Sequence, residues 1–393
     1  MSVWAELIGQ PEAADMFARA AADAHDPLSP GPAMTHAWLV TGPPGSGRST
    51  AAAAFAAALH CRSHGCGECL TCRSTISGAH PDVDIVTSDT LSYGVEDARE
   101  LIARSCIVPT TGRWQVVIIE DADRFTPAAA SVLLKVIEEP PTHLVWVLCA
   151  PNPEDVLPTI RSRTRSVQLR TPSTAQVSAA LQEKYDVDPA MASFAARASQ
   201  GHIGRARALA TDEGVRTRRQ EVLRSPSTLR DLSSCFTAAA DLLAAATEDA
   251  RSITDGLDAR ETSDLRRTYG EGGEGITAAR TTRLAGSALK TLEKHQKSRR
   301  TRTVRDQVDR ALIDLIAFYR DVFVVQLNAS AALINDEMRA QVQREAVNST
   351  AADTKQRWEA LDHARAAVAA NGALPLTLEA LMIELKDPWI RQR

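Results

Sequence analysis

The sequence predicts a parallel α/β domain at its N-terminal end, followed by two helical domains. Three observations support this fold class. Apolar runs typical of strands alternate with helical stretches over the first 170 or so residues. A glycine-rich loop follows the first of these strands, and strand-like runs fade after about residue 172 while helical spacing continues. Strands that alternate with helices favour a parallel sheet with helices packed on its faces.

Five short runs are predicted to be the strands of this sheet. Several are continuous apolar runs, as expected for strands that are covered on both faces. They are Trp38–Thr41, Val83–Val86, Gln115–Ile119, Leu144–Cys149 and Ser166–Leu169.

Helices are predicted between these strands at 50–60, 94–104 and 127–139. The last of them has clear ends, because Thr126 can cap its N-terminus and Pro140–Pro141 cannot continue it. Strand and helix therefore alternate up to about residue 170, as a parallel sheet requires.

We expect three domains along the chain. Residues 1–170 form the α/β domain, with a cysteine-rich module at 61–72. Residues 171–213 form a small helical domain, and residues 214–393 form a larger helical domain. Within the last, the glycine-rich stretch Tyr269–Gly275 is predicted to be a disordered hairpin.

The composition is that of a globular protein, with 44% hydrophobic and 24% charged residues. The net charge of −4 excludes a general attraction to nucleic acid, so any DNA contact must be local. No apolar run approaches the roughly 20 residues that span a bilayer, and the N-terminus lacks the pattern of a signal peptide. We therefore expect a cytoplasmic protein without a membrane partner.

The sharpest local motif is the loop Gly42–Ser49, with the sequence GPPGSGRS, between a predicted strand and a predicted helix. Gly42, Gly45 and Gly47 let backbone amides wrap around phosphate oxygens, and the following helix N-terminus favours an anion. Ser49 has the hydroxyl that contacts magnesium at this position. The motif predicts a site for ATP and magnesium; the alternative is an ordinary glycine-rich turn into a helix.

Two departures from the usual pattern argue against fast hydrolysis. Arg48 stands where lysine is usual, and a planar guanidinium does not replace a compact ammonium at the phosphates. Glu120 and Asp121 follow an apolar strand, where such enzymes place a magnesium-holding Asp before a water-activating Glu. The order is reversed here, and a displacement of about 1 Å can cost about 100-fold in rate. We expect nucleotide handling without strong turnover; a solvated strand end is the alternative for this acidic pair.

Four of the seven cysteines form the pattern Cys61-x4-Cys66-x2-Cys69-x2-Cys72. Clustered thiolates at this spacing suit tetrahedral zinc, and four of them leave no open position for catalysis. The prediction is a structural zinc site, in which His60 or His64 could replace Cys61. Redox or disulfide chemistry is the alternative.

Arginines offer two further candidates. In Thr159–Thr164, an arginine held at the sheet edge could stabilise charge on a phosphate bound by a neighbouring subunit, although surface arginines are common. The basic run Lys290–Arg305 could contact DNA or a partner, but a solvated helix face is the simpler interpretation.

Several motifs occur together in one order. The phosphate loop is followed by the cysteine module, by His80–Asp82 (HPD), by Ala130–Pro141 (ASVLLKVIEEPP) and by Ser162–Arg163. In this combination, residues 1–210 resemble the bacterial clamp-loader subunits of DNA polymerase III, members of the AAA+ superfamily that include delta-prime and tau/gamma. The remaining helical part resembles them only in outline.

The resemblance implies a RecA-like domain, a three-helix lid and a helical collar through which five subunits form an open ring. Such a loader uses ATP to open the sliding clamp and to place it around primed DNA. By resemblance, Arg163 corresponds to the arginine finger and Arg205 to the nucleotide-sensing arginine of the lid. The four cysteines correspond to the zinc ligands of the family.

Within this family, delta-prime subunits often have degraded nucleotide machinery, whereas tau/gamma subunits keep it. Arg48 and the Glu120–Asp121 order therefore imply a delta-prime-like stator that donates Arg163 to a neighbouring tau/gamma ATPase and also meets a delta subunit. One alternative is a catalytically active, tau/gamma-like ATPase. Another is a zinc-finger DNA-binding protein whose phosphate loop no longer functions.

Overall fold

The computed structural model describes residues 2–25, 31–87, 92–268 and 286–390. The hairpin predicted at Tyr269–Gly275 lies outside these residues. The chain divides into two compact units, Met1–Thr211 and Asp212–Arg393, and each is described by itself.

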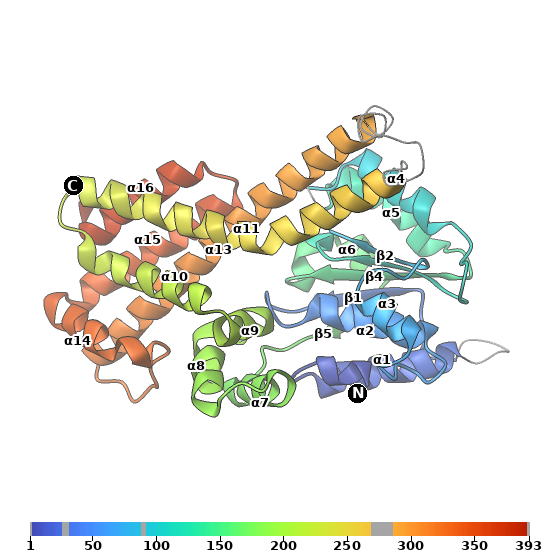
Figure 1. The fold of residues 1–393 in the computed structure, drawn as a ribbon, viewed down its shortest axis with the longest axis horizontal. Helices are drawn as coiled ribbons and strands as arrows, with labels where there is room; N and C mark the ends of the chain where they lie inside the picture. Colours follow the sequence, from blue (N-terminus) through green and yellow to red (C-terminus); the bar gives the residue numbers. More distant parts are fainter. Residues whose placement is uncertain (1, 26–30, 88–91, 269–285, 391–393) are drawn as a thin grey trace. The chain divides into compact units, whose positions relative to one another are not determined.

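The first unit is built on one parallel sheet of five strands in the order β2-β3-β4-β1-β5 (Figure 1). The five predicted strands are present, and their ends differ from the prediction by one residue at most. They are β1 (Ala37–Thr41), β2 (Val83–Val86), β3 (Gln115–Ile119), β4 (Leu144–Ala150) and β5 (Arg165–Gln168).

Side chains alternate between the two faces of the sheet, as the strand period requires. In β1, Trp38 and Val40 pack in one core and Leu39 in the other, and β3 and β4 alternate in the same way. Because every residue of these three strands is buried, the strands read as continuous apolar runs. The predicted parallel α/β fold is confirmed.

Helices cover both faces of this sheet (Figure 1). α5 begins after Thr126, whose hydroxyl accepts a hydrogen bond from the Ala129 amide, and it ends before Pro140. The helices of this part are α1 (Pro11–Ala24), α2 (Arg48–His60), α3 (Leu70–Ile76), α4 (Val95–Ser105), α5 (Pro127–Glu138) and the short α6 (Pro158–Arg161).

Three helices complete the first unit: α7 (Thr174–Tyr185), α8 (Pro189–Ser199) and α9 (Ile203–Thr211). The turns between them pass through Asp186 and Gln200, both in the left-handed backbone region.

The second unit is helical in its described residues. Val308, Leu312 and Leu315 of α13 are buried at its centre, as their helical spacing predicts. The helices are α10 (Glu213–Arg224), α11 (Leu232–Thr268), α13 (Gly286–Gln326), α14 (Arg339–Asn348), α15 (Ala351–Ala369) and α16 (Leu374–Lys386). None of the helices described in either unit is long and apolar enough to cross a membrane.

Candidate functional site

The glycine-rich loop joins the carboxyl end of β1 to the N-terminus of α2, between the neighbouring strands β4 and β5. Gly45 has φ of 81° and Gly47 has φ of 93°, a backbone region that favours glycine. The loop therefore has the strand–turn–helix geometry that places amides around a phosphate.

The Arg48 side chain bridges the end of this loop to its start. Its Nη1 donates a hydrogen bond to the Gly42 carbonyl oxygen at 2.7 Å, across the span of the loop. The Ser46 hydroxyl is buried and has no hydrogen-bond partner among the described residues. The guanidinium is therefore engaged by the protein backbone at the position where a lysine would meet phosphates.

The small helical domain formed by α7, α8 and α9 also contacts the loop. The Ile203 amide, at the start of α9, donates to the Gly45 carbonyl at 3.1 Å. The His202 ring packs so closely that a Cβ atom on Gly45 would lie 2.1 Å from its Cγ. No local sequence pattern predicts this contact, because it depends on how α9 folds back.

Beside the loop is a cavity of about 630 Å³ whose lining includes Ile8, Arg48, Ser49 and Glu120. From α9, the described lining includes Arg207 but not the predicted Arg205. The Arg207 guanidinium lies 4.8 Å from the ring centroid of Tyr185, which also lines the cavity.

The two acidic residues at the end of β3 lie in different surroundings. Glu120 lines the cavity, and its amide donates to the Val86 carbonyl at 3.0 Å. Asp121 is not among the lining residues; its Oδ1 lies 3.8 Å from Arg124 Nε. Of this pair, only Glu120 therefore lines the cavity.

Arg163 lies just after α6, with 41% of its side chain exposed. Its Nε is 2.6 Å from an Oε1 oxygen of Glu138, and its Nη1 donates to the Thr159 carbonyl at 3.0 Å and to the Ser162 hydroxyl at 3.2 Å. Nη2 makes no hydrogen bond to any described residue, which leaves it available to an external anion.

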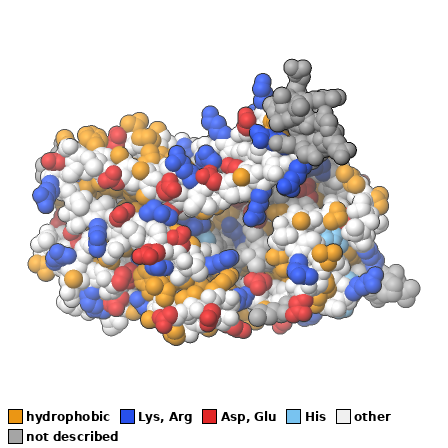
Figure 2. Space-filling view, in the orientation of Figure 1, with side chains coloured by type: hydrophobic (Ala, Val, Ile, Leu, Met, Phe, Trp, Pro, Cys, Tyr) orange, Lys and Arg blue, Asp and Glu red, His pale blue; other side chains and the backbone are white. Residues whose placement is uncertain are grey.

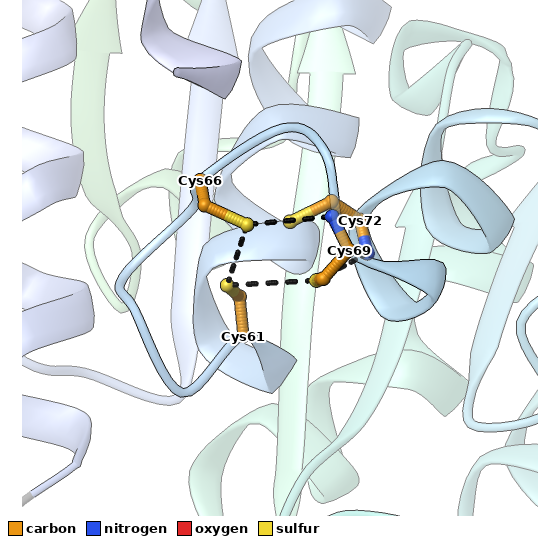
Figure 3. A group of neighbouring side chains, drawn as sticks. All are labelled: Cys61, Cys66, Cys69 and Cys72. Carbon is orange, nitrogen blue, oxygen red and sulfur yellow. Dashed lines mark hydrogen bonds between the residues drawn. The ribbon is translucent and has the colours of Figure 1, made fainter. Parts of the chain in front are cut away.

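The four cysteines converge between α2 and α3 (Figure 3). The Cys61 sulfur lies 3.7 Å from that of Cys66 and 3.8 Å from that of Cys69. A tetrahedron with zinc–sulfur bonds of about 2.3 Å has an edge of about 3.8 Å, so this spacing fits zinc. A disulfide needs sulfurs about 2 Å apart.

Backbone amides already support this arrangement. The Cys69 amide donates to the Cys66 sulfur and the Cys72 amide to the Cys69 sulfur, each at 3.4 Å. For Cys61, burial alone would raise the thiol pKa, but backbone amides including those of Cys66 and Gly65 lower it to about 6. Burial raises the pKa of Cys72, whose thiolate would need a bound cation.

The two histidines considered as zinc ligands point elsewhere. His64 packs edge-on against His25, with ring centroids 4.7 Å apart. His60 lies with His80 and Asp82, 4.4 Å from the His80 ring. Asp82 cannot serve a second metal there, because its two oxygens accept five hydrogen bonds from residues 110–112.

The basic run on α13 is largely used within the second unit. Arg299 pairs with Asp258 and Glu261 of α11. Arg300 reaches Asp255, and Arg305 donates to the carbonyl of Val368 in the last turn of α15 and to that of Gly372 just after it. On the visible face, Lys and Arg side chains are interspersed with Asp and Glu (Figure 2). These contacts favour a structural role for the run.

Comparison with known proteins finds similarity for the first unit. Residues 12–173 match the family model described as "DNA polymerase III, delta subunit". A DNA polymerase III subunit gamma/tau of Mycobacterium bovis is 39% identical over 142 residues, which cover 35% of this chain and 25% of that protein. A DNA polymerase III subunit delta′ of Yersinia pestis is 36% identical over 146 residues, covering 36% of this chain and 43% of that protein.

The match thus spans a quarter of the gamma/tau relative and less than half of the delta′ relative. Among solved structures, a gamma subunit-related protein of DNA polymerase III from Thermotoga maritima aligns with a TM-score of 0.39 and 15% identity, over 89% of this chain and 93% of that chain. The family-model match, residues 12–173, spans the five strands, the phosphate loop and Arg163. The first unit is therefore similar, over residues 12–173, to subunits of DNA polymerase III described as delta, delta′ and gamma/tau.

Proposed function

We propose that the chain is a delta′-like stator of a DNA polymerase III clamp loader. In this role it donates Arg163 to ATP bound by a neighbouring ATPase subunit, and its own site turns over ATP weakly or not at all. The observation that carries the proposal is a contrast between two arginines. Arg48 of the phosphate loop is hydrogen-bonded to the Gly42 carbonyl, whereas Nη2 of Arg163 makes no hydrogen bond to a described residue.

The phosphate loop supports the stator role. An incoming phosphate would compete with the Gly42 carbonyl for Arg48, and His202 and Ile203 pack against Gly45. If ATP and magnesium bind, the loop amides, Ser49 and Glu120 are the groups that would hold them. Of the acidic pair Glu120–Asp121, only Glu120 lines the cavity, so efficient activation of water is not expected.

Arg163 supports the finger role. An arginine supplied to a neighbour's nucleotide stabilises charge that develops on the transferred phosphoryl group. Such a residue must be accessible and must retain donors for phosphate oxygens. Arg163 is half exposed and retains Nη2.

The proposed setting is a cytoplasmic hetero-pentamer with delta and tau/gamma subunits, acting on the sliding clamp and primed DNA. In it, the second unit is the collar and residues 171–213 are the lid. Zinc at Cys61, Cys66, Cys69 and Cys72 is structural. A zinc-finger DNA-binding role is disfavoured because the arginines of the basic run are paired within the unit.

A tau/gamma-like active ATPase is the second candidate. The observations that favour it are the 39% identity to a gamma/tau subunit and the cavity of about 630 Å³ beside Ser49 and Glu120. Its distinguishing requirement is turnover by the chain's own site.

The test measures ATP hydrolysis with magnesium by the chain alone, and by the loader reconstituted from the chain and its ATPase and delta subunits. We expect negligible turnover alone, and turnover in the loader that falls at least about tenfold with Arg163→Ala. Turnover by the isolated chain at about 1 s⁻¹ or faster would favour the second candidate. An unchanged rate with Arg163→Ala would contradict the finger role.

A further inference from the structure

We propose that Glu138 is a positioning residue for Arg163. Its carboxylate holds the guanidinium at Nε, so that Nη2 remains for the phosphates of the neighbouring subunit. This inference rests on the proposed function, in which Arg163 acts on ATP bound by that subunit.

The contacts of Arg163 define the orientation of its guanidinium. Nε lies 2.6 Å from Glu138 Oε1, while Nη1 donates to the Thr159 carbonyl at 3.0 Å and to the Ser162 hydroxyl at 3.2 Å. Nε and Nη1 are therefore both engaged, whereas Nη2 makes no hydrogen bond to a described residue. An unrestrained arginine samples many rotamers, whereas a group that acts on a transition state must be held close to its productive geometry.

Only one of these partners comes from outside the Arg163 segment. Thr159 and Ser162 belong to the same turn, but Glu138 is the last residue of α5, which packs on the sheet through Leu133 and Ile137. Glu138 therefore connects the arginine to a buried helix. The other two contacts can move with the turn itself.

The position of Glu138 is not explained by helix stability. A carboxylate at the C-terminal end of a helix opposes the helix dipole. The pairing with Arg163 compensates for this unfavourable placement. Glu139, the next residue, is also exposed but makes no ion pair with a described residue.

The pair is half exposed, with 41% of the Arg163 side chain and 46% of the Glu138 side chain accessible. An ion pair in that setting contributes little to folding. Its removal should leave the fold intact and change the orientation of Arg163. Glu138 can therefore be tested without unfolding the chain.

The experiment measures steady-state ATP hydrolysis by the reconstituted loader and determines kcat and KM. The variants are Glu138→Ala, Glu138→Gln, Arg163→Ala and the double variant, and Glu139→Ala is the matched control. We expect Glu138→Ala to lower kcat about five- to tenfold with KM within about twofold. Glu138→Gln should lose less, because its amide oxygen can still lie against Nε, and Glu139→Ala should match the wild type.

The double variant separates positioning from a structural role. If Glu138 acts through Arg163, Glu138→Ala should have no further effect once Arg163 is alanine. An additive loss, a wild-type rate for Glu138→Ala, or a faster rate would each overturn the positioning role while Arg163→Ala remained defective. A wild-type rate for Arg163→Ala would instead overturn the proposed function and this inference with it.

Discussion

Asp82 organises the segment between α4 and β3 at the level of single atoms. Its oxygens accept bonds from the amides and hydroxyls of Thr110 and Thr111 and from the Gly112 amide, at 2.5 to 3.0 Å. Burial alone would raise the pKa of this carboxyl, but these donors, Thr111 foremost, hold it well below its usual range. The sequence showed Asp82 within a family motif, but not that it binds this loop.

We predict that Asp82→Ala lowers the free energy of unfolding of the first unit by about 3 kcal/mol, because five hydrogen bonds to a buried carboxylate are lost. Because the pKa of Asp82 is lower in the folded state than in the unfolded state, ionised Asp82 stabilises the fold fully above its unfolded pKa of about 3.9. This stabilisation is lost as the pH falls through the pKa of the folded state. The decrease in unfolding free energy caused by Asp82→Ala should thus be equal at pH 7 and pH 5, and smaller in strong acid. Denaturant unfolding checks this, with the more exposed Asp84→Ala as control.

His202 is the second residue whose role only the folded chain reveals. Its Nδ1 accepts from the Arg205 amide at 3.2 Å while its ring covers Gly45. We predict that His202→Ser strengthens binding of ATP with magnesium about tenfold, because serine removes the ring but can still cap α9. Calorimetric titration of the full chain measures this; equal affinity of variant and wild type would show that the ring does not obstruct the loop.

At the scale of elements, the cysteine module supports the N-terminal segment. The Val3 amide donates to the Gly65 carbonyl at 3.0 Å, and a Cβ on Gly65 would lie 2.5 Å from Val3 Cγ2. The same segment continues to Gln10, whose side chain pairs with the backbone of Arg170 just after β5. The module therefore contacts an N-terminal segment that continues to the backbone of Arg170, shortly before α7.

We predict about one zinc per chain in the wild type and its loss in Cys69→Ser. Without the metal, Gly65 is no longer held, so amide exchange of residues 2–10 should accelerate at least about tenfold. Metal analysis and hydrogen exchange measure the two effects. Cys106→Ser, at an exposed cysteine outside the cluster, is the control and should keep both zinc and protection.

The elements differ in how far the sequence could predict them. The strands and α5 were predictable because apolar runs, Thr126 and the prolines act locally. The contact of His202 with Gly45 and the ion pair of Glu138 with Arg163 join residues far apart in the chain, so no local pattern encodes them. The inclusion of Arg207 and not Arg205 in the cavity lining depends on the rotation of α9, which motif alignment does not determine.

At the scale of the whole molecule, the two units are stabilised differently. The first has apolar cores on both faces of a sheet. The second adds a buried polar network in which Arg219 of α10 pairs with Asp314 of α13 at 3.2 Å and with Glu337 at 2.9 Å, and also donates to Asn335. Composition and periodicity predicted helices here, but they could not indicate that a charged residue of α10 lies inside.

Arg219 and Asp314 are almost fully buried, with 5% and 4% of their side chains exposed. Burial alone would lower the pKa of Arg219, but Asp314 and Glu337 raise it, so the network keeps its charge. Removal of the arginine would leave a buried carboxylate without its cation, which typically costs 3–5 kcal/mol, or about 4 kcal/mol here.

We therefore predict that Arg219→Ala destabilises the second unit selectively. Hydrogen exchange of the full chain should show faster opening of α10 and α13, while β1, β3 and β4 keep their protection. Arg339→Ala, which removes an exposed ion pair with Asp336, is the matched control and should cost less than about 1 kcal/mol. Equal effects of the two variants would show that burial of the network is not what stabilises the unit. Equal loss of protection in both units would show that they unfold as one.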